Sequence, residues 1–386
     1  MQRSERRILV THVGSLPRPP ALRDLLVRVD RRDPVDRAQF EREAEAAVRR
    51  VLDAQIAAGI DVVNDGEQPR AGFSTYVATR MRGFGGESKR PLAIDQVEFP
   101  DYADMLASRR RGSARIMNAA QAVAEIEYAD LSEAAWECDL FARVSAASAD
   151  RFTERFMTAA SPGVIATILL DAHYGAHERY VAALAREMQK EYELIHQKGL
   201  VLQLDCPDLA MERTRFFQKD SLERFQEVVA LHVEAINRAV ANIPPDRVRL
   251  HVCWGNYDGP HTHDVALEAV LPIFYTAKVG ALSLPLANPR HQHEYAVIKR
   301  HPLPDGMILV PGVIDSTTNY VEHPEVVANR ICEAVDAVGD RTRVIAATDC
   351  GFGTFAGSEN VAASVVWAKL RALSDGAAIA TRRLWK

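Results

Sequence analysis

Short apolar runs rich in β-branched residues alternate with amphipathic helical segments along the whole chain of 386 residues. Strands that alternate with helices predict a parallel sheet, and eight such repeats favour a closed (β/α)8 barrel over a doubly wound open sheet. About eight runs fit strands, at 8–13, 61–65, 164–170, 201–205, 249–253, 281–286, 307–314 and 343–348. We therefore expect an α/β fold in which residues 1–386 form one (β/α)8 TIM barrel.

The segments between these runs have the marks of helices. Apolar residues recur at helical spacing over 48–56, and Gly59 stands where a left-handed helix C-cap belongs. The same spacing recurs over 181–195. Asp220 and Glu223 have the spacing of an N-terminal capping pair, which predicts a further helix after them.

The region from about residue 72 to residue 161 departs from the repeat. It contains Pro91, Pro100 and helical patches around 119–128 and 133–147. We interpret it as an excursion inserted after the second strand, with the role of a lid.

Composition narrows the classes of partner. The chain has 47 Lys and Arg against 52 Asp and Glu, so we expect no general attraction to nucleic acid or to an anionic membrane. It has no apolar run of about 18 residues, which a spanning helix would need, and its first residues lack the apolar core of a secretory signal. Five cysteines without a C-x-x-C spacing favour a reducing compartment over a disulfide framework. We expect a cytoplasmic protein.

Polar residues collect where the expected strands end. In a parallel barrel the carboxyl ends of the strands form one face, and chemistry is carried out there. The residues at these ends, in chain order, are His12, Ser15, Asp65, Glu67, Asp205, His251, Cys253, Asn288, His291, Asp315, Asp349 and Cys350. This distribution predicts one shared active site.

The strongest local pattern is His251-Val252-Cys253. Residues two apart on a strand point to the same face, so the imidazole and the thiol would both project into the barrel. Cys350, at the end of the eighth expected strand, would add a third donor. Nitrogen and sulfur donors suit Zn²⁺, but a core histidine with two core thiols fits the same spacing, because cysteine is often buried.

Seven motifs together resemble a known family. They are THVGSLPRP, DVVNDGEQPR, VLQLDCPDL, LHVCWGN, ANPRHQHE, PGVIDS and ATDCGFGT. Their order and spacing resemble the catalytic half of the cobalamin-independent methionine synthases, over the whole chain except about 72–161. The resemblance implies a barrel of the uroporphyrinogen decarboxylase and methionine synthase type, with a zinc ion that binds a substrate thiol for alkyl transfer. The chain is also similar to the epoxyalkane:coenzyme M transferases.

The resemblance assigns roles to particular residues. It makes His251, Cys253 and Cys350 the zinc ligands. Gly14 and Ser15 resemble the loop that holds the amino acid thiol.

Four carboxylates complete the candidate site. Glu67 and Asp205 resemble the family's carboxylates that meet the ammonium group of the thiol substrate. Such charges are costly in a barrel mouth without a cation. Asp315 and Asp349, at the ends of the seventh and eighth expected strands, are the candidate catalytic carboxylates.

The chain departs from the family at several points. The family's fourth zinc ligand is a glutamate, and Pro285 stands in its position. The family also has a histidine that serves the folate leaving group. Its position aligns with Thr317 or a neighbour, and the next histidine in this chain is His323. Cys206 replaces the acid that follows Asp205. Full-length methionine synthases also carry a second, N-terminal barrel, for which this chain has no room.

The resemblance implies a zinc-dependent thiol S-alkyltransferase, and first of all a methyltransferase related to those that make methionine. Its partners would be a small thiol such as homocysteine and an alkyl or methyl donor. The alternative is a zinc-dependent enzyme that adds a thiol to an epoxide or a similar electrophile. A zinc-holding or thiol-binding barrel without turnover is a third interpretation, favoured by the missing glutamate.

Overall fold

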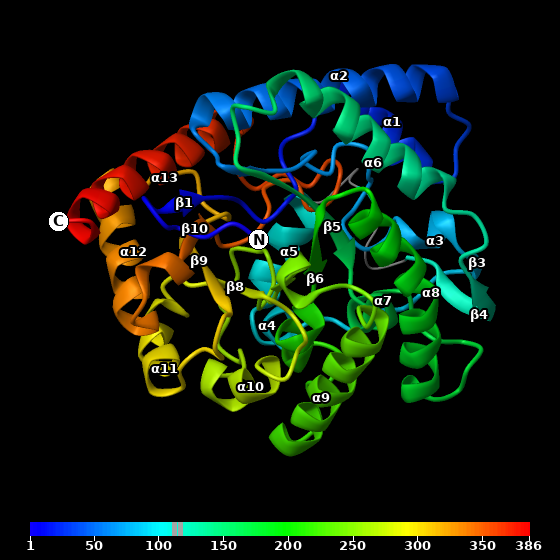
Figure 1. The fold of residues 1–386 in the computed structure, drawn as a ribbon. Helices are drawn as coiled ribbons and strands as arrows, with labels where there is room; N and C mark the ends of the chain where they lie inside the picture. Colours follow the sequence, from blue (N-terminus) through cyan, green and yellow to red (C-terminus); the bar gives the residue numbers. More distant parts are fainter. Residues whose placement is uncertain (110–113, 115–118) are drawn as a thin grey trace.

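The barrel expected from the alternating pattern is confirmed. The computed structural model describes residues 1–109, 114 and 119–386. Eight strands form one sheet in the order β1-β10-β9-β8-β7-β6-β5-β2, with parallel pairing between neighbours, and helices surround it (Figure 1). The strands are β1 (Leu9–Val10), β2 (Val62–Val63), β5 (Glu154–Ala160), β6 (Val201–Asp205), β7 (Val248–His251), β8 (Ala281–Pro285), β9 (Ile308–Ile314) and β10 (Ile345–Thr348).

The two ends of the sheet meet at a seam between the short strands β1 and β2. The Asp61 amide donates to the carbonyl oxygen of Val10 at 3.0 Å. The Val10 amide in turn donates to the Asp61 carboxylate at 2.9 Å, and the Thr11 hydroxyl donates to the Val62 carbonyl at 2.9 Å. Side chains therefore contribute two of these three bonds that close the barrel.

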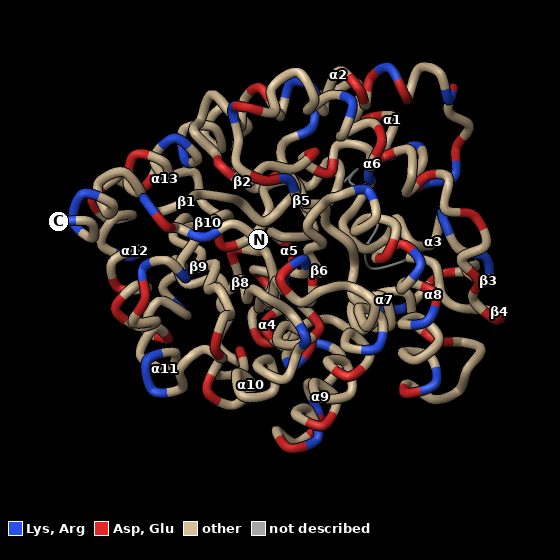
Figure 2. The backbone as a smooth tube through the Cα atoms, viewed as in Figure 1, with Lys and Arg blue, Asp and Glu red and all other residues tan. Residues whose placement is uncertain are grey.

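The outer helices include those expected from the amphipathic segments at 48–56 and 181–195. They are α1 (Pro20–Asp30), α2 (Arg37–Ala58), α7 (Pro162–Ile168), α8 (His177–Gln197), α9 (Leu222–Ala239), α10 (Leu267–Phe274), α11 (Tyr295–Arg300), α12 (Pro324–Val338) and α13 (Ala363–Leu384). Helix α2 ends at Gly59, whose φ of 83° confirms the left-handed cap. The cap of α9 is Ser221 and not Asp220, because the Ser221 side chain accepts from the Arg224 amide. Acidic and basic residues are interspersed along the longer of these helices (Figure 2).

The third strand was placed wrongly from the sequence. Residues 164–170 fall in and just after helix α7, and the third barrel strand is β5, which lies inside the expected excursion. Ser161 caps α7 through the Val164 amide, and Pro162 occupies its first turn. Every residue of α7 is buried, so its sequence is apolar all round and lacks helical periodicity.

The excursion after the second strand consequently ends before β5. It contains α3 (Val77–Arg80), α4 (Ile94–Glu98), α5 (Pro100–Arg109) and α6 (Ser132–Ser145), together with an antiparallel pair of strands, β3 (Arg82–Gly85) and β4 (Gln121–Glu127). Helix α6 confirms the helical patch at 133–147, whereas the patch at 119–128 is largely strand β4. None of the helices in the described part of the chain is both long and apolar enough to cross a bilayer.

Helix α4 connects the excursion to the carboxyl end of the barrel. The Asp95 carboxylate accepts from the His261 amide at 2.9 Å and from the Tyr257 hydroxyl at 3.2 Å. Both partners belong to the loop after β7, which also carries Cys253. The excursion therefore lies against the end of the barrel where the polar residues were expected to gather.

Candidate active site

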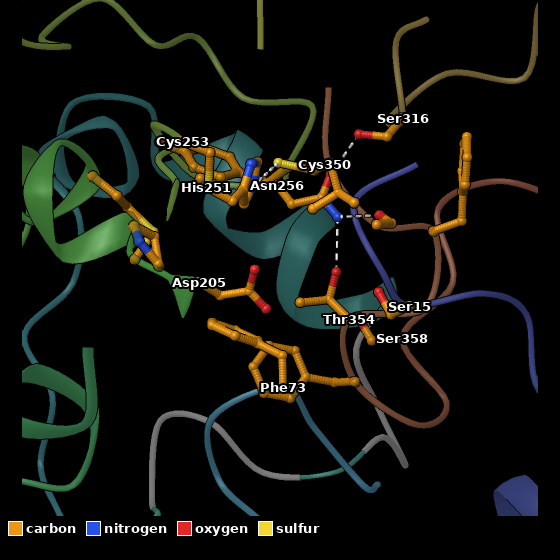
Figure 3. Close-up of a pocket in the computed structure, with 18 of the residues that line it drawn as sticks. Ser15, Phe73, Asp205, His251, Cys253, Asn256, Ser316, Cys350, Thr354 and Ser358 are labelled. Carbon is orange, nitrogen blue, oxygen red and sulfur yellow. Dashed lines mark hydrogen bonds between the residues drawn. The ribbon is translucent and has the colours of Figure 1, made fainter. Parts of the chain in front are cut away.

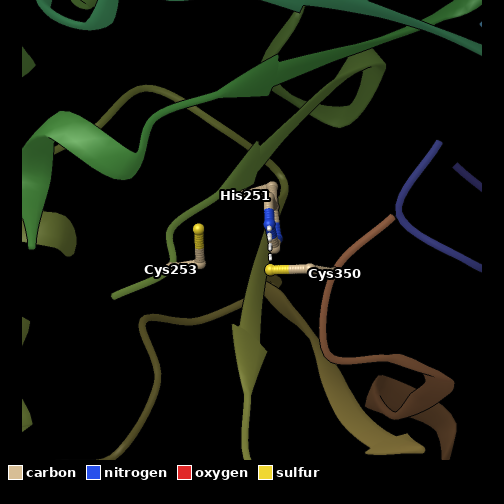
Figure 4. A group of neighbouring side chains, drawn as sticks. All are labelled: His251, Cys253 and Cys350. Carbon is tan, nitrogen blue, oxygen red and sulfur yellow. Dashed lines mark hydrogen bonds between the residues drawn. The ribbon is translucent and has the colours of Figure 1, made fainter. Parts of the chain in front are cut away.

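Three side chains with donor atoms suited to a metal ion meet at the carboxyl end of the barrel (Figure 4). His251 ends β7, Cys253 follows two residues later, and Cys350 follows β10. Their ligand atoms all lie within 4.8 Å of one another, and all three residues are buried. The Cys350 Sγ and the His251 Nε2 are 3.7 Å apart. The structure thus brings together the three residues that the sequence proposed as a set.

Neighbouring groups orient this set. The Ser283 hydroxyl lies 3.3 Å from the His251 Nδ1, so the Nε2 faces the sulfurs. The hydrogen bond between the two cysteines lowers the pKa of Cys253 and raises that of Cys350. One imidazole and two sulfurs in a buried site are donors that suit Zn²⁺. The donor set fits the metal that the resemblance implies.

A cavity of about 110 Å³ opens beside the three side chains (Figure 3). One water needs roughly 10 to 15 Å³ of such space, so a small organic molecule can enter. Ser15, Glu67 and Asp205 line the cavity together with His251, Cys253 and Cys350. Lining residues that the sequence did not suggest include Phe73, Arg90, Met211, Arg215, Asn256, Tyr257, Ser316, Phe352, Thr354, Phe355 and Ser358.

The loop after β1 makes room for the Glu67 carboxylate. Gly14 has a φ of 147°, and a Cβ at this position would lie 2.6 Å from the Glu67 Oε1. That oxygen accepts from the Thr158 hydroxyl at 3.1 Å. Among the described residues, the Glu67 Oε2 has no hydrogen-bond partner. Burial raises the pKa of Glu67 from 4.5 to about 7, against the opposite effects of Arg70 and Arg18.

Asp205, at the end of β6, is the second carboxylate of the cavity. Its Oδ1 accepts from the Gln203 side chain at 2.7 Å. Burial and the nearby charge of Glu67 raise the pKa of Asp205 well above its usual range. Two buried carboxylates that face one cavity can stabilise a cation such as an ammonium group.

Asp315 and Asp349 do not line the cavity. The Asp349 carboxylate accepts from the amides of Ala287 and Asn288 at 2.9 and 3.0 Å. Asp315 accepts from the Thr317 amide at 3.0 Å and from nearby hydroxyls, which is a turn within its own loop. Both carboxylates hold loops in place by these hydrogen bonds, and their catalytic role stays a prediction.

Asn256 was missed by the sequence reasoning. Its Nδ2 donates to the Gly351 carbonyl and the Thr354 hydroxyl, each at 2.7 Å, and its Oδ1 accepts from Ser316 at 3.0 Å (Figure 3). It therefore joins the loops after β7, β9 and β10 around the cavity. The motif LHVCWGN contains it, but nothing in its spacing separates Asn256 from a turn residue.

His291 and Pro285, two further residues near strand ends, also lie outside the cavity lining. His291 contacts Asp264 and Glu294 at 2.9 Å each and stacks on Trp254. Pro285 ends β8 in register with Gly312 and offers no ligand atom. The position of the family's glutamate is therefore filled by a buried ring.

The fold and the site together define a (β/α)8 barrel with a buried His-Cys-Cys group beside a small cavity, and the comparisons relate this barrel to known proteins. No family model matches the sequence. The chain is 26% identical to a methionine synthase of Thermococcus kodakarensis, over 88% of this chain and 85% of that protein. It is 25% identical to a methionine synthase of Saccharolobus solfataricus, over 83% and 81%. The resemblance inferred from the motifs is confirmed.

A shorter match points to the second similarity. The chain is 31% identical to a 2-hydroxypropyl-CoM lyase of Xanthobacter autotrophicus, over 31% of this chain and 38% of that protein. Among solved structures, the B12-independent methionine synthase of a Shewanella species in complex with selenomethionine superposes with a TM-score of 0.73 at 21% identity, over 98% of this chain and 99% of that one. This likeness supports the barrel fold.

Proposed function

We propose that the protein is a zinc-dependent methyltransferase that methylates the sulfur of homocysteine or of a closely similar amino acid thiol. The main observation behind this proposal is that His251, Cys253 and Cys350 meet beside a cavity that is also lined by Glu67 and Asp205. The relatives named methionine synthase, similar over most of the chain, support the same interpretation.

Each group has a defined task in this proposal. His251, Cys253 and Cys350 would hold Zn²⁺, which makes a bound thiol a thiolate near neutral pH. Glu67 and Asp205 meet the ammonium group and so fix the direction in which the thiol enters. The loop of Gly14 and Ser15 shapes the cavity wall beside them.

Pro285 bears on the methyl donor. Zn²⁺ with two thiolates and a neutral imidazole would have a net charge of zero. With the family's glutamate as an additional ligand, the net charge of the metal and its ligands would be −1. A less negative ligand set favours deprotonation of the thiol but makes the resulting sulfur less nucleophilic. We therefore propose a donor more reactive than methyltetrahydrofolate.

Transfer of a thiol to an epoxide is the second candidate, because the chain also resembles the 2-hydroxypropyl-CoM lyase over 145 residues. Coenzyme M is a sulfonate without an ammonium group. Glu67 and Asp205 would face that anion with like charge, so they favour the amino acid thiol.

The first experiment measures zinc and turnover together. We expect about one zinc per chain in the purified protein, and its loss in a Cys253→Ser, Cys350→Ser double variant. Cys332→Ser, which changes a thiol outside the group, is the matched control. Stoichiometric zinc in the double variant would contradict the metal assignment.

The same preparations are screened with homocysteine, coenzyme M, several methyl donors and an epoxide. S-methylation of homocysteine supports the proposal, and an adduct of coenzyme M with the epoxide supports the second candidate. Thiol binding without any product would identify a barrel that holds zinc and thiol without turnover. Glu67→Gln and Asp205→Asn should weaken homocysteine binding and leave the zinc content intact.

A further inference from the structure

Two polar side chains lie one layer below the cavity residues Asp205 and His251. Strands β6 and β7 pair Gln203 with Arg249, and Asp205 with His251 in the next layer. Side chains two apart on a strand share a face, so all four project into the barrel. Barrel interiors of this fold are usually filled with branched apolar side chains. A glutamine and an arginine below the site therefore require an explanation.

Arg249 is a buried cation. It is 3% exposed, and its guanidinium donates to the Gln203 Oε1 at 2.6 Å, to the Thr11 hydroxyl at 3.3 Å and to the His12 carbonyl at 3.1 Å. No salt bridge joins it to a carboxylate in the part of the chain that the structure describes. A buried charge without an ion-pair partner is costly to retain.

Gln203 links Arg249 to Asp205 through hydrogen bonds from the two ends of its amide. A guanidinium only donates hydrogen bonds, so it fixes the amide with the Oε1 toward Arg249. The Nε2 must then point the other way, where it donates to the Asp205 Oδ1 at 2.7 Å and to the Val13 carbonyl. One oxygen of Asp205 is thereby held from below, while its carboxylate faces the cavity (Figure 3).

We propose that Arg249, acting through Gln203, is a positioning residue that fixes the Asp205 carboxylate for the ammonium group of the thiol substrate. The inference rests on the proposed function, because it requires an amino acid thiol. The arrangement supplies specificity, since only a substrate with a cation at this point gains from an oriented carboxylate.

Glu67 is held by a separate group. Its Oε1 accepts from Thr158, and neither Gln203 nor Arg249 donates to it. A change at Gln203 should therefore affect one of the two cavity carboxylates and leave the hydrogen bond of the other intact.

The test compares two ligands that differ only in the amino group, homocysteine and 4-mercaptobutyrate. Binding of each to the zinc-loaded protein is measured by calorimetry. Wild type should prefer homocysteine. Gln203→Met, which is similar in size but cannot bridge, should reduce that preference by about tenfold. Its affinity for 4-mercaptobutyrate and its zinc content should not change.

Variants of the arginine extend the test. Arg249→Met should reproduce the effect of Gln203→Met. Arg249→Lys keeps the charge and the donors of a single nitrogen, so it should restore part of the preference. Thr11→Val is the control for loss of a neighbouring contact, because it removes one hydrogen bond of the guanidinium and the seam bond to the Val62 carbonyl but leaves the hydrogen bonds between Arg249, Gln203 and Asp205 in place. Its preference should equal that of wild type.

The outcomes separate the two proposals. A folded, zinc-loaded Gln203→Met protein that keeps the wild-type preference overturns the positioning role alone. A wild type that binds both ligands equally overturns the amino acid thiol and the positioning role with it. If Gln203→Met does not fold, Gln203→Asn, whose side chain is too short to bridge, is measured with the same two outcomes.

Discussion

Glu67 has a backbone and an environment that glutamates rarely adopt. Its φ is 52°, in the left-handed region, and its side chain is 2% exposed. Its amide donates to the Asp65 carboxylate at 2.9 Å, which ties the turn together. Strained residues of this kind concentrate at functional sites, where the surrounding structure holds them. The strain supports the substrate-binding role that the resemblance assigned to Glu67.

The pKa of Glu67 predicts a pH dependence of stability. Because burial raises this pKa from 4.5 to about 7, the folded protein binds a proton that the unfolded chain has released. Stability should therefore fall as pH rises from about 4.5 to about 7 and stay lower above that range. Glu67→Gln removes the titrating group, so the variant should have a higher Tm than wild type at pH 8.

Thermal unfolding between pH 5 and 9 measures this difference. Glu234→Gln, which changes an exposed glutamate in a surface ion pair, is the control and should shift Tm little. A Glu67→Gln protein that is less stable than wild type at pH 8 would show that the charged form is well compensated in the folded state.

Pro285 gives a prediction about the reaction. Wild type should form little or no methionine from methyltetrahydrofolate and homocysteine, because its expected zinc ligands lack the added negative charge that strengthens the sulfur nucleophile. Pro285→Glu should raise this activity. Pro285→Gln, of similar size but uncharged, should not. Product formation is followed with zinc-loaded protein, and rapid methionine formation by wild type would contradict the argument.

At the scale of elements, the alternation of strands and helices could be predicted from the sequence more reliably than the type of each single segment. The barrel followed from the alternation alone, and the strand runs at 201–205 and 281–286 coincide closely with β6 and β8. Residues 164–170 were mistaken for a strand because a fully buried helix has neither helical nor strand periodicity. The Ser161-Pro162 pair was the local signal that could have corrected this.

The site shows the same division. His251 and Cys253 were predictable because strand geometry puts alternate residues on one face, and the Val252 amide continues the pairing to the Ser283 carbonyl just beyond the end of β7. Arg90, Asn256 and Phe355 were not, because they belong to the excursion and to long loops. The course of such segments depends on tertiary packing that local patterns do not contain.

Helix α7 offers a test at this scale. The Ser161 hydroxyl accepts from the Val164 amide and donates to the buried Asp208 carboxylate at 2.7 Å. Ser161→Ala should lower the free energy of unfolding by about 2 kcal/mol, at the upper end for a helix cap. Ser221→Ala, which removes a cap from α9, should cost about 1 kcal/mol. Urea denaturation measures both, and equal costs would show that the bond to Asp208 contributes nothing.

At the scale of the whole molecule, both the excursion and the barrel contribute to the wall of the cavity. Helix α4 contacts the loop after β7 through Asp95, and Arg90 lines the cavity. The wall of the cavity therefore comes partly from outside the (β/α)8 repeat. The role of a lid, inferred from the sequence, stays a prediction.

The seam between β1 and β2 has a consequence for local opening of the barrel. Local opening requires least free energy where few backbone bonds must break together, so amide hydrogens at 8–16 and 60–68 should exchange with deuterium faster than those of β5 and β6. Gly14, Ser15 and Glu67 follow the two seam strands. A bound thiol that contacts both loops would hold them together and slow the exchange of their amide hydrogens, while the exchange rates in β5 and β6 would not change. Mass spectrometry of the deuterated peptides would detect this, and equal protection throughout the barrel would contradict it. Occupancy of the site would then be linked to closure of the barrel itself.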